Sequence, residues 1–177
     1  MNTNGSMQNV GWPNSVSPGI GAFRIDVPSD WSAIEPVGGL IAFLAPPPDN
    51  PSDDPSDNFR VNLVVFGERV PADKDLGELA EEALLGAGAT DIVAIGVDGA
   101  ESEEQLPSAA RRTDLMLQGR MVRQLAVTTE GPDRSPTGVR SVYALVGSCL
   151  TERAEVDEHI LTEMISSFTV TAGMPAH

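Results

Sequence analysis

Four arginines gather within a short stretch of a strongly acidic chain. The protein has 177 residues, with 26 acidic and 11 basic side chains and a net charge of −15, so a local group of cations stands out. A guanidinium group forms paired hydrogen bonds with carboxylates and phosphates. The cluster therefore predicts either a local site for an anion or an acidic peptide, or a set of ion pairs with Asp114 and neighbouring carboxylates. Its members are Arg111, Arg112, Arg120 and Arg123.

Two methionines lie among these arginines in the sequence. Met116 and Met121 carry flexible, polarisable side chains that adapt to irregular apolar partners. Such side chains suit a groove that holds apolar protein segments, and they suit an ordinary core equally well. With the four arginines they make up the candidate binding set of this chain.

Other residues that could do chemistry lack the surroundings that the chemistry needs. Gly147-Ser148-Cys149 together with His159 could be imagined as a nucleophile and its base, but the Gly-x-Ser-x-Gly turn of a serine hydrolase is absent. We predict that Cys149, which ends a strand, is a small core residue. The motif census therefore predicts no catalytic residues and no enzyme.

Metal and phosphate motifs are equally incomplete. Glu155 and His159 are one helical turn apart, but the His-Glu-x-x-His pattern is missing, which favours a solvated helix face. An acidic, proline-rich loop lacks the spacing of a calcium-binding loop. Gly86-Ala87-Gly88 ends a predicted helix, so it offers no helix N-terminus to a phosphate. We expect no cofactor and no metal site. The acidic loop carries Asp49, Asp53, Asp54 and Asp57.

The candidate binding set lies on a predicted hairpin of two long strands, Ala109–Leu117 and Arg120–Thr129. A two-residue turn at Gln118-Gly119 places Met116 opposite Met121 and Asp114 opposite Arg123. A three-residue loop, with Gly119 in the left-handed position, is the alternative. We prefer the first register because the one-residue shift sets Asp114 against an apolar side chain.

The remaining elements surround this hairpin. Apolar periodicity predicts further strands and two helices, and their order favours an antiparallel sheet with helices packed on it, an α+β sandwich. Asp75 with Glu78 resembles a helix capping box, and Thr151 is the expected cap of the last helix. The buried stripe of that helix is predicted to include Val156. The strands are expected at 22–27, 39–45, 59–66, 91–97 and 139–148, and the helices at 73–85 and 152–167.

Composition limits the possible partners. A net charge of −15 disfavours nucleic acid and anionic membranes because phosphates repel such a surface. No apolar stretch reaches the roughly 20 residues that cross a bilayer, and the single cysteine allows no internal disulfide. The first twenty residues contain no basic residue and no apolar run, so we expect a cytoplasmic protein; a leader removed from a longer chain stays open.

Short motifs at both ends of the predicted domain resemble a known superfamily. Residues 23–31 read Phe-Arg-Ile-Asp-Val-Pro-Ser-Asp-Trp and look like the F-x-I-x-x-P-x-x-W opening of the PsbP-like (Mog/PsbP) superfamily, while Ile165-Ser166-Ser167-Phe168 resembles its closing I-x-S-F helix. Within that superfamily the nearest likeness is to LpqN-type actinobacterial proteins. The likeness covers about residues 22–170. We expect residues 1–21 to be a flexible arm, 22–170 a single domain, and 171–177 a frayed tail.

The resemblance implies a curved antiparallel sheet of about six to seven strands with two main helices, and a binding role without catalysis. Relatives in the superfamily include a photosystem assembly factor, a nuclear-transport cofactor and chaperones that hold apolar segments of secreted effectors. We therefore expect a protein-binding or chaperone-like module, linked to secretion or cell-envelope assembly, whose unidentified partner is a protein such as a secreted substrate. The alternative is a protein that binds a small ligand, an anion or a metal through the acidic loop or the arginine cluster.

Overall fold

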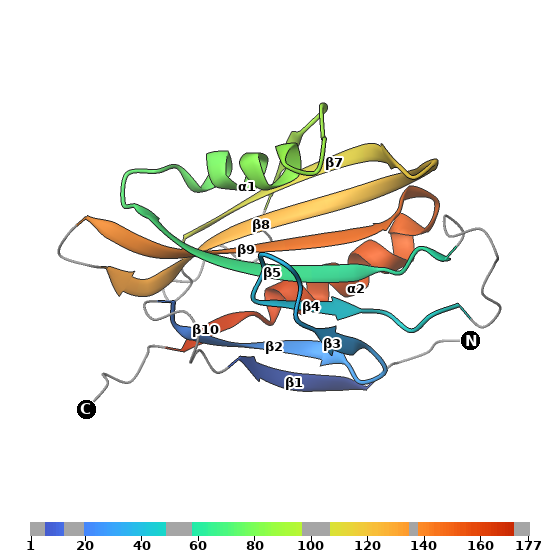
Figure 1. The fold of residues 1–177 in the computed structure, drawn as a ribbon, viewed down its shortest axis with the longest axis horizontal. Coiled ribbons are helices and arrows are strands. Elements are labelled where there is room, and N and C mark those ends of the chain that lie inside the picture. Colours follow the sequence, from blue (N-terminus) through green and yellow to red (C-terminus); the bar gives the residue numbers. More distant parts are fainter. Residues whose placement is uncertain (1–5, 13–19, 49–57, 97–106, 135–137, 172–177) are drawn as a thin grey trace.

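The computed structural model describes residues 6–12, 20–48, 58–96, 107–134 and 138–171 (Figure 1). It contains a seven-stranded sheet in the order β3-β4-β5-β9-β8-β7-β6 and a three-stranded sheet in the order β1-β2-β10, and every neighbouring pair is antiparallel. The predicted α+β architecture with two main helices is confirmed. The elements are β1 (Met7–Trp12), β2 (Ala22–Pro28), β3 (Ser32–Ile34), β4 (Ile41–Leu44), β5 (Asn62–Pro71), α1 (Leu76–Leu85), β6 (Val93–Ile95), β7 (Ser108–Leu117), β8 (Arg120–Arg134), β9 (Val139–Leu150), the 3-10 helix η2 (Thr151–Arg153), α2 (Ala154–Ser166) and β10 (Thr169–Thr171).

The predicted hairpin is confirmed in the preferred register. Asp114 pairs with Arg123 and Met116 pairs with Met121 across β7 and β8. The two turn residues have positive φ, 50° at Gln118 and 82° at Gly119, as a two-residue turn between twisted strands requires. The alternative three-residue loop is therefore excluded.

One face of the large sheet packs against α2, and we call it the α2 face. Side chains alternate between the two faces of a strand, so Leu63, Val65 and Leu145 point the same way. They pack with Leu161 and Met164 of α2 in one fully buried cluster. Strand β2 adds its own apolar side chains to this cluster, so the three-stranded sheet lies on the same side.

The opposite face packs against α1, and we call it the α1 face. Val146 follows Leu145 on β9 and so points to this face, as does its pairing partner Ala126 on β8. Both contact Ala80 and Leu84 of α1. Figure 1 shows α1 above the long strands and the three-stranded sheet below them. The helix begins at its cap Asp75, whose carboxylate accepts a hydrogen bond from the backbone N–H of Glu78 at 3.0 Å, so the predicted cap is confirmed.

Aromatic side chains fill the centre of the α2 side. The ring centroids of Phe23, Tyr143 and Phe168 lie 5.0 to 6.0 Å apart in tilted and edge-on arrangements. The buried hydroxyl of Tyr143 donates to the carbonyl of Gly21 at 2.7 Å, which ties β9 to the start of β2. Trp31 is buried in the same cluster.

Both ends of the chain are more ordered than the sequence predicts. Met7–Trp12, assigned to a flexible arm, forms β1 and pairs with residues 23–28 of β2. Thr169–Thr171, which reaches into the tail that was expected to be frayed from residue 171, forms β10 on the other edge of β2. These segments carry no periodic signal because the pairing partner, rather than their own composition, makes them strands. Residues 1–5, 13–19 and 172–177 lie outside the described residues.

Details of the last helix also differ from expectation. Thr151 makes no side-chain capping bond, because a 3-10 turn over Thr151–Arg153 precedes α2, and the hydroxyl of Thr151 has no partner among the described residues. Val156 is 62% exposed rather than buried, since the preceding turn rotates the helix so that Ala154 and Asp157 face inward instead.

Several predicted strands change their bounds. The strand predicted over 59–66 begins later and ends at Pro71, because the alternating pattern continues to the buried Val70. The strands predicted over 39–45 and 91–97 shorten to 41–44 and 93–95, and residue 97 lies outside the described residues. Strands β5 and β9 are neighbours in the interior of the seven-stranded sheet. No described helix combines the length and the apolar character that a membrane crossing requires.

Replacing Gly119 by alanine tests the turn. A Cβ at a φ of 82° strains the left-handed conformation, so Gly119→Ala should lower the free energy of unfolding by about 1–2 kcal/mol in urea denaturation. Gly96→Ala is the matched control, because an added Cβ there meets nothing within 4 Å and the φ is not positive. Equal destabilisation by the two substitutions would contradict the turn geometry.

Candidate functional site

An ion-pair network lies on the α2 face of the hairpin. Arg123 donates to both oxygens of Asp114, from Nε at 2.8 Å and from Nη2 at 2.9 Å, and its Nη1 reaches Oε2 of Glu158 on α2 at 3.1 Å. Arg112 Nη1 contacts the other oxygen of Glu158 at 3.3 Å. The two guanidinium groups therefore join the hairpin to α2 through one shared carboxylate.

The network shifts the pKa values of its members. The hydrogen bond from Arg123 holds the pKa of Asp114 below its usual value, and that same bond raises the pKa of Arg123. Burial opposes both shifts. The pair therefore stays ionised near neutral pH, and it fixes the side chains that lie next to the hairpin turn.

The arginine cluster of the sequence is divided between the two sheet faces. Three of its members are paired: Arg112 and Arg123 as described, and Arg120 with Glu152 at 2.9 Å. Arg111 lies on the α1 face, because it stands opposite Ala126 in the register. The sequence allowed two interpretations of the cluster, an anion site or ion pairs with nearby carboxylates. Three of the four arginines form such ion pairs.

The two methionines are exposed at the turn. Met116 is 63% exposed and Met121 is 44% exposed, and Leu117 beside them is 40% exposed. We call these three residues the hairpin tip. The core interpretation of the methionines is therefore wrong, because both side chains lie open to water. An apolar group that is left open to water at a rigid turn is available for contact with another molecule.

An apolar slot lies further along the same face. Its volume is about 190 Å³, and it lies between α2 and the strands β6, β7 and β8. Ala110, Leu125 and Val127 form the floor, and Glu158 of the ion-pair network lies at its edge. The two methionines of the hairpin tip, the network and the slot therefore follow one another along the α2 face of β7 and β8. Sequence reasoning missed the slot because it depends on where α2 crosses the sheet.

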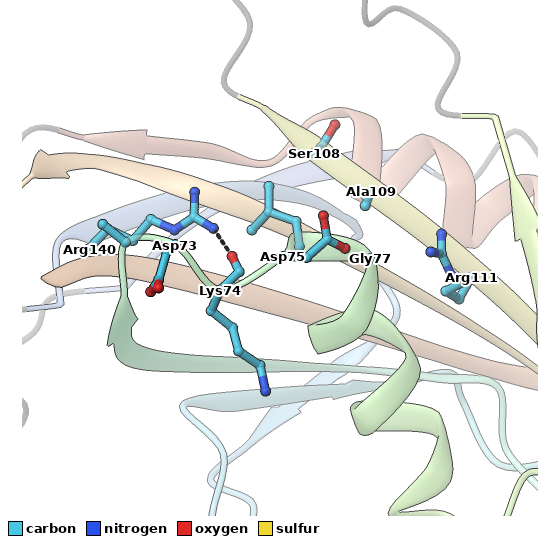
Figure 2. Close-up of a pocket in the computed structure, with 10 residues that line it drawn as sticks. Asp73, Lys74, Asp75, Gly77, Ser108, Ala109, Arg111 and Arg140 are labelled. Carbon is cyan, nitrogen blue, oxygen red and sulfur yellow. Dashed lines mark hydrogen bonds between the residues drawn. The ribbon is translucent and has the colours of Figure 1, made fainter. Parts of the chain in front are cut away.

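A wide depression opens at the N-terminus of α1 on the opposite face, with a volume of about 500 Å³ (Figure 2). Figure 2 shows Asp73, Asp75 and Gly77 of the α1 entry, with Arg111 of β7 on one side and Arg140 of β9 on the other. Arg140 Nη1 donates to the buried Glu130 at 2.9 Å, and Arg140 also donates to the carbonyl of Lys74.

Two of the three cations that line this depression are already paired with carboxylates. The ammonium of Lys74 contacts Glu82 at 2.5 Å, and Asp75 caps the helix. Within the described segments only Arg111 of these lining cations lacks a carboxylate at ion-pair distance; its Nη1 donates to the carbonyl of Ala110 at 3.1 Å. Any affinity for an anion here therefore depends on Arg111 and on the N-terminus of α1.

The imagined nucleophile and base do not meet. Ser148 and Cys149 point to opposite faces of β9, and Cys149 is fully buried, as predicted. His159 is exposed on α2 and contacts Glu163 at 3.3 Å. Among the described residues no three His, Cys, Asp or Glu side chains are placed to hold a metal ion, and Asp49, Asp53, Asp54 and Asp57 lie outside them.

Cys149 should resist alkylation in the folded protein. Burial, followed by the charges of Asp157 and Glu158, raises its pKa from 9.0 to about 11. The fold favours the neutral thiol, so the stabilisation is complete below pH 9 and is lost as pH rises towards 11. We expect iodoacetamide to label Cys149 very slowly at pH 8 and fully in urea, measured by intact mass. Equal labelling rates in the two conditions would contradict its burial.

Comparison with known proteins shows likeness at the level of structure. No protein-family model matches this chain, and no curated protein matches it. The crystal structure of LpqN, involved in cell envelope biogenesis of Mycobacterium tuberculosis, aligns over 94% of this chain and 92% of its own with a TM-score of 0.64 at 15% identity. The Ran-binding protein Mog1p of Saccharomyces cerevisiae aligns over 93% and 96% with a TM-score of 0.50 at 16% identity. This chain therefore shares the fold of LpqN and Mog1p, as the sequence motifs implied.

Proposed function

We propose that this protein is a non-enzymatic protein-binding module whose site is the α2 face of the β7–β8 hairpin. The observation that carries the proposal is the exposed methionine pair, 63% and 44% open to water at the end of a rigid hairpin. Exposed apolar side chains contribute binding energy when a partner covers them, because their apolar area is then removed from water.

Three features of the face favour an extended apolar segment as the partner. The hairpin tip offers adaptable side chains, the slot beside α2 offers a pocket of about 190 Å³ for an apolar side chain, and the ion-pair network between them keeps the spacing of the two constant. The protein carries a net charge of −15, so basic residues flanking the apolar segment would be attracted to it.

The known proteins of this fold agree with a binding role. Mog1p is described as Ran-binding and LpqN as involved in cell envelope biogenesis. By analogy we propose a chaperone-like role towards a protein with exposed apolar segments, and secretion or envelope assembly as its setting. The analogy rests on the fold alone, so the proposal depends chiefly on the hairpin tip.

The double substitution Met116→Ser with Met121→Ser tests this role. Both side chains are exposed, so thermal stability should change little, while capture of partners from native lysate should fall by about tenfold or more. Quantitative mass spectrometry compares the captured proteins with those of the unsubstituted chain and of Val37→Ser, a control at a fully exposed valine outside the hairpin. If every captured protein survives the double substitution, the hairpin tip is not the site.

A second candidate function, anion binding, is favoured by Arg111 at the N-terminus of α1 (Figure 2). Phosphate should raise the melting temperature of the unsubstituted protein and of Arg24→Gln, an exposed control arginine, and should leave that of Arg111→Gln unchanged. Differential scanning fluorimetry at constant ionic strength makes the comparison. The absence of any shift, or an equal shift in all three proteins, would remove this candidate.

A further inference from the structure

A polar row crosses the apolar α1 face of the large sheet. The register places Thr113 opposite Gln124, Gln124 opposite Ser148, and Ser148 opposite Asn62, so the four residues lie side by side on β7, β8, β9 and β5. Thr113, Gln124 and Ser148 are all more than 90% buried. Polar side chains at such positions normally find hydrogen-bond partners.

Two atoms of this row have no partner in the described part of the chain. The amide nitrogen of Gln124 donates to the hydroxyl of Ser148 at 3.2 Å, but its oxygen Oε1 has no hydrogen bond, and the hydroxyl oxygen of Thr113 has none either. An unpaired acceptor in a low-dielectric surrounding is costly, and a bound molecule with a suitably placed donor removes that cost.

A pocket of about 310 Å³ lies above the row, beneath the C-terminal end of α1. Gln124, Ser148 and Asn62 form its polar part, and no charged residue is among the residues that line it. Its apolar walls come from two strands and the helix, and the exposed residues Gly86 and Ala87 lie at the mouth. The walls are Val64, Phe66, Ala83 and Val146.

The size and lining of the pocket define the ligand. A volume of about 310 Å³ equals that of roughly ten water molecules and lies at the lower end of small-molecule sites. A charged group would be desolvated there without an opposite charge. The C-terminal end of α1 and Oε1 of Gln124 both favour a hydrogen-bond donor. An apolar body with one neutral donor group satisfies all of these conditions.

We propose that the side chain of Gln124, whose oxygen is closed to solvent in this structure, rotates to present that oxygen to the pocket, and that a small neutral molecule with an apolar body binds there and donates an amide-type N–H to it. The site lies on the α1 face, whereas the proposed protein-binding surface lies on the α2 face. The two sites are therefore independent, and a failure of one leaves the other standing.

Three matched probes test the proposal by titration of the ¹⁵N-labelled protein, followed in ¹H–¹⁵N correlation spectra. 3-Phenylpropanamide should shift the side-chain amide of Gln124 and the backbone signals of Ser148 and Ala83. N,N-dimethyl-3-phenylpropanamide, which lacks the donor, and 3-phenylpropanoate, which is charged, should bind about tenfold more weakly or less. Equal affinity for the three probes, or no shifts at these residues, would overturn the proposal.

Two variants test separately the hydrogen bond to Gln124 and the access of the probe to the pocket. Gln124→Leu keeps a similar volume and removes the unpaired amide, so the melting temperature should be retained while the affinity for 3-phenylpropanamide falls by about tenfold. Ala87→Trp covers the mouth from an exposed position and should also weaken the binding. The control Ala94→Trp, at an exposed residue of β6, should bind the probe normally. Undiminished binding by both test variants would show that the probe sits elsewhere, which overturns the site.

Discussion

The structure depends on covering a large sheet that is apolar on both faces. Strand β8 has 15 residues and α1 has 10. A strand of that length spans roughly 50 Å, but a ten-residue helix covers only about 15 Å. On one face α2 and the three-stranded sheet together cover the strands. On the other face α1 is the helix that packs against them. The pocket beneath its C-terminal end follows from this difference in length.

Polar anchors determine where the short helix lies. The hydroxyl of Thr128 donates to the carbonyl of Leu76 at 2.6 Å, and Arg140 binds both the carbonyl of Lys74 and the carboxylate of Glu130. The side chains of Arg140 and Glu130 are only 10% and 3% exposed. A buried ion pair of this kind contributes little net stability but penalises other arrangements strongly. It therefore fixes the start of α1 at one end of β8 and β9, and leaves the other end open.

Features formed within one short segment of the chain could be predicted from the sequence, whereas features formed by pairing of distant segments could not. The hairpin was predictable because its alternation, its Gly119 turn and the Asp114–Arg123 charge pair all lie within one short segment. The exposure of Met116 was not, since a period of two does not reveal whether a helix covers the face. The polar row was also hidden, because Gln124, Ser148 and Asn62 become neighbours only through strand pairing. The end strands β1 and β10 have no signal apart from their partner β2.

The position of β2 between β1 and β10 has a consequence for biosynthesis. Thr169 pairs with Arg24, and the aromatic cluster needs Phe168 as well as Phe23. On a ribosome, Phe23 emerges long before Phe168 is made, and at ordinary elongation rates the delay is on the order of 10 s. During that time the nascent chain contains β2 but lacks Phe168 and β10, which pack and pair with it. The aromatic cluster and the β2–β10 pairing are therefore completed only after the last helix has been translated.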